Sequence, residues 1–159
     1  MNAIRKELRT LAELEAAADT VIELAQSSLR IFSSQLSVAY NSPDRTEKLR
    51  QFLLASPRNR LHITLHNAAS VQNSCPRMIV LLRTFSHNMA IRETGAEAKG
   101  AHDEIILADD AHYVHRIHFA RARGEMVLRD AEATQELKQR FEEIWLASSP
   151  SIAATTLGL

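Results

Sequence analysis

The segment HDEIILAD, residues 102–109, begins the most strand-like region of this sequence. Its centre is short and apolar and is bounded by acidic residues, which is typical of a buried β-strand. Residues 109–112 form a polar turn, and Tyr113 to Ile117 follow as a second short run. The pattern predicts strands at Glu104–Ala108 and Tyr113–Ile117, joined as a β-hairpin.

The chain before this segment alternates between helical and strand patterns. Thr10 and Glu13 form a capping box that opens a helix with apolar residues at helical spacing. Ser42 is an N-cap residue followed by Pro43 at the first helical position. The predicted helices cover residues 11–27, 43–56 and 70–87, and the predicted strands cover residues 29–36, 61–66 and 89–92.

After the hairpin, residues 125–128 predict one further strand. Asp130 is a good N-cap for a closing helix that buries Leu137, Phe141 and Trp145. Alternating helices and strands followed by a hairpin predict an α/β fold with a mixed β-sheet flanked by helices on both faces. We expect a single α/β domain over residues 1–149 and a loosely ordered C-terminal tail over residues 150–159.

The segment resembles the H-x-K-x-x-x-x-D motif of the phospholipase D superfamily. His102 and Asp109 match the motif, and Glu104 stands where the motif has Lys. The order of elements around it, including a later helix that carries a Phe and a Trp, is also similar to that family. The chain is therefore identified as a single, degenerate phospholipase D-like half-domain of a bacterial type.

The resemblance implies a specific chemistry, which this sequence supports only in part. In such enzymes one His attacks phosphorus, a second His protonates the leaving group, and paired Lys residues neutralise the phosphoryl oxygens. Glu104 reverses that charge, and the family's later G-S-x-N element is absent. His102 and Asp109 are thus candidate catalytic residues of a degenerate site. Because the chain holds one motif where two are needed, the resemblance implies a homodimer.

Composition excludes several broad classes of protein. Lys plus Arg equals Asp plus Glu at 19 each, so no global charge attracts the chain to nucleic acid or membrane. No apolar run is long enough to span a bilayer, and no secretory leader is evident. The single Cys75 fits a reducing compartment. We expect a cytoplasmic protein without membrane insertion, for which nucleic acid is an unlikely partner.

Other residue clusters have less specific interpretations. His112, His115 and His118 suggest metal binding, but alternation along a strand sends His115 to the opposite face, so we expect no metal and no cofactor. Arg116, Arg121 and Arg123 form a basic cluster that could bind phosphate or nucleic acid, or could remain solvated on an exposed ribbon. Arg92 or Lys99 could replace the missing Lys.

The sequence leaves three hypotheses of function open. The first is a non-catalytic domain that acts through binding or assembly as a homodimer, with a possible protein partner. The second is a divergent phosphodiesterase or phosphotransferase that uses His102. The third, which is less favoured, is a nucleic-acid-associated factor.

Overall fold

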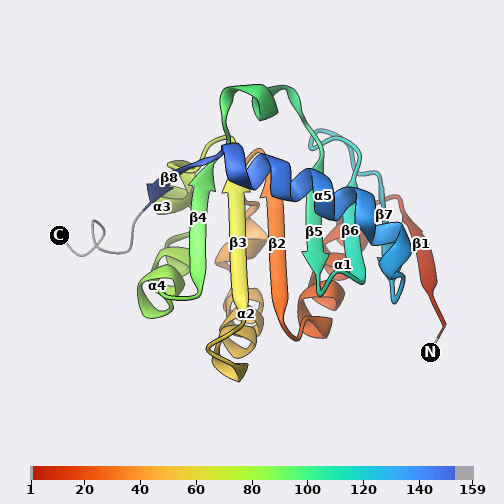
Figure 1. Ribbon diagram of the computed structural model, residues 1–159, viewed down its shortest axis with the longest axis horizontal. Coiled ribbons are helices and arrows are strands. Elements are labelled where there is room, and N and C mark those ends of the chain that lie inside the picture. Colours follow the sequence, from red (N-terminus) through yellow and green to blue (C-terminus); the bar gives the residue numbers. More distant parts are fainter. Residues whose placement is uncertain (1, 153–159) are drawn as a thin grey trace.

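The computed structural model describes residues 2–152 and contains an eight-stranded mixed sheet (Figure 1). The strands are β1 (Ile4–Leu8), β2 (Ser28–Ser33), β3 (Arg60–Leu65), β4 (Met89–Glu93), β5 (Glu104–Ala108), β6 (His112–Arg116), β7 (Gly124–Leu128) and β8 (Ser149–Ile152). The helices are α1 (Leu11–Leu24), α2 (Pro43–Ala55), α3 (Ser70–Ser74), α4 (Pro76–Thr84) and α5 (Ala131–Ala147). Two short 3-10 helices are η1 (Val38–Asn41) and η2 (Ala96–Gly100).

The longest helices begin where the sequence predicts. The side chains of Thr10, Ser42 and Asp130 each accept a hydrogen bond from a backbone N–H in the first turn of α1, α2 and α5. The helix predicted over residues 70–87 is instead two helices, α3 and α4. The helix is interrupted at Cys75 because Pro76 has no N–H and favours the first position of a new helix.

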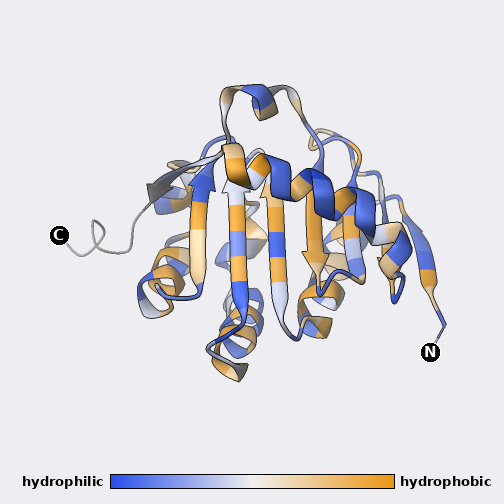
Figure 2. Cartoon of the chain, in the orientation of Figure 1, coloured by the Kyte–Doolittle hydropathy of each residue, from blue (hydrophilic) through white to orange (hydrophobic). Residues whose placement is uncertain are grey.

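Helices cover both faces of the sheet, as predicted. In Figure 1, α5 crosses the front of the sheet while α1 and α2 lie behind it. The core behind the sheet joins α1, α2, α3 and α4 to the strands, and a smaller core at the front is formed with Phe141 and Ile144 of α5. Figure 2 shows hydrophobic positions on each of the central strands, separated by hydrophilic ones.

The strand order brings the carboxyl end of β2 to the beginning of β5. Strands β2, β3 and β4 are parallel, whereas β5 is antiparallel to β2 and continues into β6 and β7 as a meander. The register pairs Phe32 with Ile105, so the following Ser33 lies beside the preceding Glu104. This junction between parallel and antiparallel strands positions the candidate site.

The two edge strands differ from the sequence prediction. β1 pairs with β7, and β8 pairs with β4, although neither segment was predicted as a strand. Residues 150–152 of the expected loose tail belong to β8, because β4 offers an open edge for pairing. The rest of that tail, residues 153–159, lies outside the described residues. Within residues 2–152 the helices are too short or too polar to cross a membrane.

Candidate functional site

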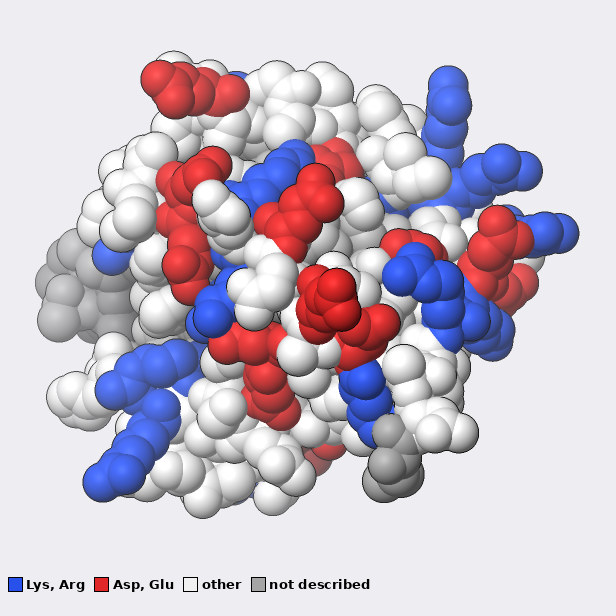
Figure 3. All heavy atoms as spheres, turned by 45° about the vertical axis from the view of Figure 1, so that its right-hand side comes forward, with Lys and Arg blue, Asp and Glu red and all other residues white. Residues whose placement is uncertain are grey.

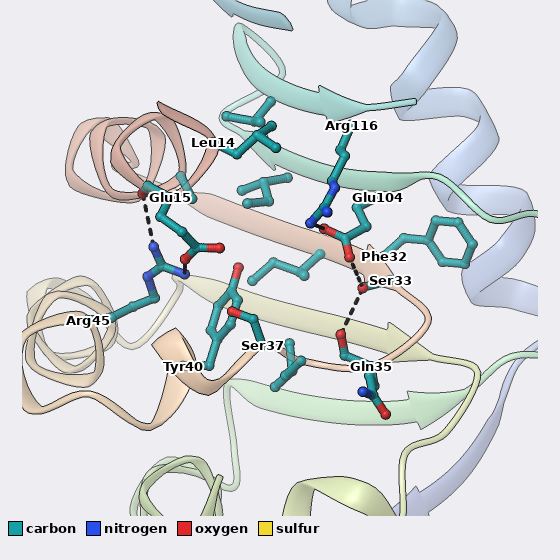
Figure 4. A pocket seen from close by; sticks show the side chains of 15 residues that line it. Leu14, Glu15, Phe32, Ser33, Gln35, Ser37, Tyr40, Arg45, Glu104 and Arg116 are labelled. Atoms are coloured by element: carbon teal, nitrogen blue, oxygen red, sulfur yellow. Dashed lines mark hydrogen bonds and ion pairs between the residues drawn. The ribbon is translucent and has the colours of Figure 1, made fainter. Parts of the chain in front are cut away.

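A small cavity lies at the carboxyl end of β2, between the sheet and the first half of α1 (Figure 4). Its volume is about 40 Å³, which is enough for water or a very small group. The apolar part of the wall comes from α1 and the central strands. The polar lining residues are Glu15, Ser33, Gln35, Ser37, Tyr40, Arg45, Glu104 and Arg116.

Glu104 reaches this cavity from β5 and contacts Ser33 and Arg116. Ser33 Oγ lies 2.9 Å from Glu104 Oε1 and also 2.9 Å from the backbone oxygen of Gln35. A hydroxyl has one proton, so it can donate to both oxygens only in turn. Ser33 is the donor in both contacts, so its hydroxyl links Glu104 to the backbone that follows β2.

The surroundings of Glu104 shift the pKa of its carboxyl group. Burial raises the pKa of its carboxyl group, and the contacts with Ser33 and Arg116 oppose this rise only in part. Arg116 Nη1 lies 3.7 Å from Glu104 Oε2, across the β5–β6 pair. Arg116 is therefore the cation that lies beside Glu104 in this site. Its place directly opposite Glu104 on the hairpin is the feature of the sequence from which this contact could have been predicted.

The buried Arg45 of α2 lines another side of the cavity, next to α1. Its Nε donates to Asp19 at 2.8 Å, its Nη2 donates to the Glu15 carbonyl at 3.0 Å, and its Nη1 lies 2.9 Å from the Glu15 carboxylate. The guanidinium also lies over the ring of Tyr40. Because both neighbouring carboxylates already occupy Arg45, its charge closes the wall between α1 and α2 and offers little to an anion.

The structure separates the two motif residues that the sequence brings together. His102 is exposed just before β5 begins, and Asp109 follows the other end of that strand. Asp109 accepts hydrogen bonds from the backbone N–H groups of residues 26, 27 and 28 and from the Ser27 hydroxyl. Asp109 therefore fixes the loop between α1 and β2, at a distance from Glu104.

The sequence analysis missed the role of Asp103, which lies between His102 and Glu104. Asp103 is buried on the face of the sheet covered by α5, where both carboxylate oxygens accept from Arg140. His115 Nε2 lies 2.8 Å from the same carboxylate. These contacts hold the pKa of Asp103 well below its usual range despite burial, and they anchor the start of β5 to α5.

The other candidates have separate environments. Arg92 lies over the Trp145 ring, and Lys99 Nζ donates to the His66 carbonyl at 2.9 Å, so neither is placed beside Glu104. His112 Nδ1 accepts from the Arg129 N–H, and His118 Nδ1 accepts from the Ala120 N–H. In the part of the chain that the structure describes, no three His, Cys, Asp or Glu residues form a group suited to a metal ion.

Comparison with known proteins places this arrangement in context. The family model described as "Domain of unknown function (DUF7931)" matches residues 10–157. No curated protein matches the chain. A solved structure of TrmBL2, an archaeal chromatin protein with a novel mode of DNA binding, is similar with a TM-score of 0.67 and 10% identity. The match covers 92% of this chain and 55% of TrmBL2, so the chain spans about half the length of that relative.

Two similar structures are matched over nearly their whole length. Nuc from Salmonella typhimurium, a phospholipase D family member, gives a TM-score of 0.65 at 12% identity, with 96% of this chain and 100% of Nuc covered. NucT from Helicobacter pylori gives 0.64 at 14% identity, with 94% and 99% covered.

Proposed function

Because this chain belongs to the DUF7931 family and has the fold of the phospholipase D superfamily, we propose that it is a non-catalytic domain of that fold that acts through binding or assembly as a homodimer. The observation that carries the proposal is the environment of Glu104. A carboxyl group occupies the position where the motif places a phosphate-binding Lys, and it is engaged by Ser33 and Arg116.

The charge at this position argues against phosphoryl transfer. At about 4 Å and an effective dielectric of about 20, a pair of unit charges interacts by about 4 kcal/mol, so an ionised Glu104 repels phosphate strongly. A protonated Glu104 removes the repulsion but supplies no cation. Arg116 does not replace the Lys freely, because Glu104 and the Arg121 carbonyl already engage its guanidinium.

The position of Asp109 also supports a structural role for the degenerate motif. Its carboxylate accepts hydrogen bonds from residues 26–28, at the end of β5 opposite to His102. His102 is exposed, and its ring lies beside those of His118 and Phe119.

A phosphodiesterase assay tests the loss of catalysis. Wild type, His102→Ala and the exposed control His87→Ala are incubated with a generic aryl phosphodiester, and release of the aryl group is measured. We expect no turnover above buffer for any of the three. Turnover that His102→Ala abolishes and His87→Ala preserves would overturn the proposal in favour of a divergent phosphodiesterase using His102, the alternative that the exposed imidazole supports.

Light scattering tests the assembly. The homodimer is proposed from the half-domain resemblance, in which two copies supply the two motifs. We expect a dimer mass across micromolar protein concentrations. A monomer mass over the whole range would remove the dimer from the proposed function.

A further inference from the structure

The loop between β6 and β7, residues 117–123, combines aromatic and basic side chains on one exposed segment. Its sequence is IHFARAR, and residues 111–124 contain three Arg and three His but no Asp or Glu. The neutral total charge of the chain therefore conceals a local excess of positive charge. Figure 3 shows Lys and Arg side chains at the upper right of that face and others at its lower left, with acidic side chains mainly near its centre and some at its right edge.

The loop carries a stacked aromatic surface. The rings of His118 and Phe119 are stacked, with centroids 5.0 Å apart and an interplanar angle of 18°. The ring of His102 lies against both, at 5.3 Å from His118 and 5.9 Å from Phe119. Phe119 is 41% exposed and the neighbouring Ile117 is 64% exposed. Exposure of a phenyl ring to this extent costs hydrophobic free energy, which a ligand that stacks on it would recover.

Hydrogen bonds hold the loop in this shape. Arg116 Nε donates to the Arg121 carbonyl at 2.7 Å, and the Arg121 N–H donates to the His118 carbonyl at 2.9 Å. The Phe119 N–H donates to the His102 carbonyl at 2.8 Å, which ties the loop to the start of β5. A fixed loop loses less conformational entropy when a ligand binds.

The two arginines at the end of the loop are available to an anion. Arg121 and Arg123 are exposed, and within residues 2–152 neither lies in an ion pair with a carboxylate. Arg123 does interact with the carboxylate of Glu7 through its charge. The pKa of Glu7 is lowered mainly by its contact with Arg9 and to a smaller extent by Arg123. Free guanidinium groups beside a stacked aromatic pair match a polymer that alternates phosphate groups with flat bases.

We propose that this aromatic–basic loop binds single-stranded nucleic acid, with Phe119 and His118 stacking on bases and Arg121 and Arg123 contacting phosphates. The inference rests on the proposed function only in that the domain acts through binding. A single strand is favoured over a duplex because stacking on Phe119 needs an unpaired base. Arg116 is a positioning residue, since its guanidinium is held by Glu104 and the Arg121 carbonyl.

Fluorescence anisotropy of a labelled single strand tests the proposal. A strand about 20 nucleotides long exceeds the usual site size of about 4–16 nucleotides, and a duplex of the same sequence serves as the competitor. We expect Phe119→Ala to weaken binding by about tenfold, and Arg121→Gln with Arg123→Gln to weaken it further and to flatten its salt dependence. Leu54→Ala and Arg58→Gln, which change an exposed apolar side chain and an exposed arginine elsewhere, are the matched controls and should bind like wild type.

The outcomes separate the inference from the proposed function. Equal affinity of Phe119→Ala, the arginine variant and wild type would overturn the inference, as would a preference for the duplex. Binding to anionic phospholipid vesicles without binding to the single strand would also overturn it, and would assign the loop to a membrane surface. Cleavage of the bound strand would instead overturn the non-catalytic function, while leaving the loop as the binding surface.

Discussion

At the level of single residues, the main result concerns the raised pKa of Glu104. The sequence suggests a carboxylate that repels phosphate. The structure places the group in a small cavity, against a hydroxyl that already has a backbone acceptor. Burial raises the pKa of Glu104, while the hydrogen bond from Ser33 and the positive charge of Arg116 lower it in part. The cavity at the junction of β2 and β5 therefore holds a titratable carboxyl group.

The first prediction follows from this raised pKa. A carboxyl group with a raised pKa binds more protons in the folded protein, so its contribution to stability is lost as the pH rises through the folded pKa. Glu104→Gln mimics the protonated acid and should be more stable than wild type at pH 8, with the difference shrinking as the pH falls toward the ordinary pKa of Glu. Thermal unfolding across this pH range measures the effect.

The control for this experiment is Glu47→Gln, on the exposed surface of α2. Its effect on thermal unfolding should be small and should depend little on pH. A Glu104→Gln protein that is less stable than wild type at pH 8 would show that the contact with Arg116 outweighs burial.

The second prediction concerns His62, whose ring stacks on Trp145 with centroids 4.3 Å apart. Burial, together with the positive charges of Arg30, Arg92 and Arg60, lowers the pKa of His62 to about 4. The unfolded chain therefore binds a proton more readily, and stability is lost as the pH falls from about 6.5 toward 4. Allowing for the solvent screening of a half-buried ring, this loss is about 1–2 kcal/mol.

His62→Phe keeps an aromatic ring against Trp145 and removes the titration. We expect its free energy of unfolding to change less than that of wild type between pH 7 and pH 4.5, as measured by urea denaturation. His87→Gln, at an exposed position, should follow the wild-type pH dependence. Parallel pH curves for His62→Phe and wild type would assign the acid sensitivity to another group.

At the level of elements, strand β5 is fixed at both ends by acidic side chains. Its start is anchored to α5 through Asp103, and its end is fixed by Asp109 to the loop before β2. Side chains between these anchors alternate between the two cores. His102 and Asp109 therefore lie at opposite ends of one strand, and the hydrogen bonds of Asp109 give it a structural role.

The third prediction tests this structural role. Asp109→Ala removes the acceptor for residues 26–28 and should lower the free energy of unfolding by about 2–3 kcal/mol. Asp109 has a positive φ of 56°, which Asn tolerates, so Asp109→Asn should lose less. Urea denaturation measures both variants. Neither variant should change binding at residues 117–123, and an unchanged stability of Asp109→Ala would contradict the assigned role.

At the level of the whole molecule, the sheet extends beyond the family match at its beginning. β1 precedes residue 10, where the family match begins, yet it pairs with β7 over its full length. Leu8 is 2% exposed, and Arg5 contacts Glu125 at 2.6 Å. The first strand thus covers an edge of β7 that would otherwise present unpaired backbone groups.

The fourth prediction follows from this edge. Deleting residues 2–9 should lower stability by about 2 kcal/mol or more, because Leu8 loses its burial and β7 becomes an edge strand. Urea denaturation and turbidity at increasing protein concentration measure the two effects. Arg5→Gln, which keeps the strand and removes an exposed ion pair, is the control and should be close to wild type. Full stability of the shortened chain would show that β1 is an accessory strand.

The sequence by itself determined the elements whose signals are local. The caps at Thr10, Ser42 and Asp130 set three helix starts, and the apolar run of HDEIILAD with its polar turn set the hairpin. These features depend on neighbouring residues, so periodicity and capping were sufficient. The fold resemblance could be found for the same reason, because it rests on the order of such elements.

The tertiary structure alone decided the edge strands and the site. The segment IRKEL of β1 has no strong strand pattern, and its pairing depends on the free edge of β7, more than 100 residues away. Ser33 and Glu104 meet only because β2 pairs with β5, and Phe119 and His102 meet only because the β6–β7 loop folds back on the start of β5. A local sequence pattern does not determine with which distant strand a segment pairs. The raised pKa of Glu104 and the aromatic surface of the loop therefore became visible only in the folded chain.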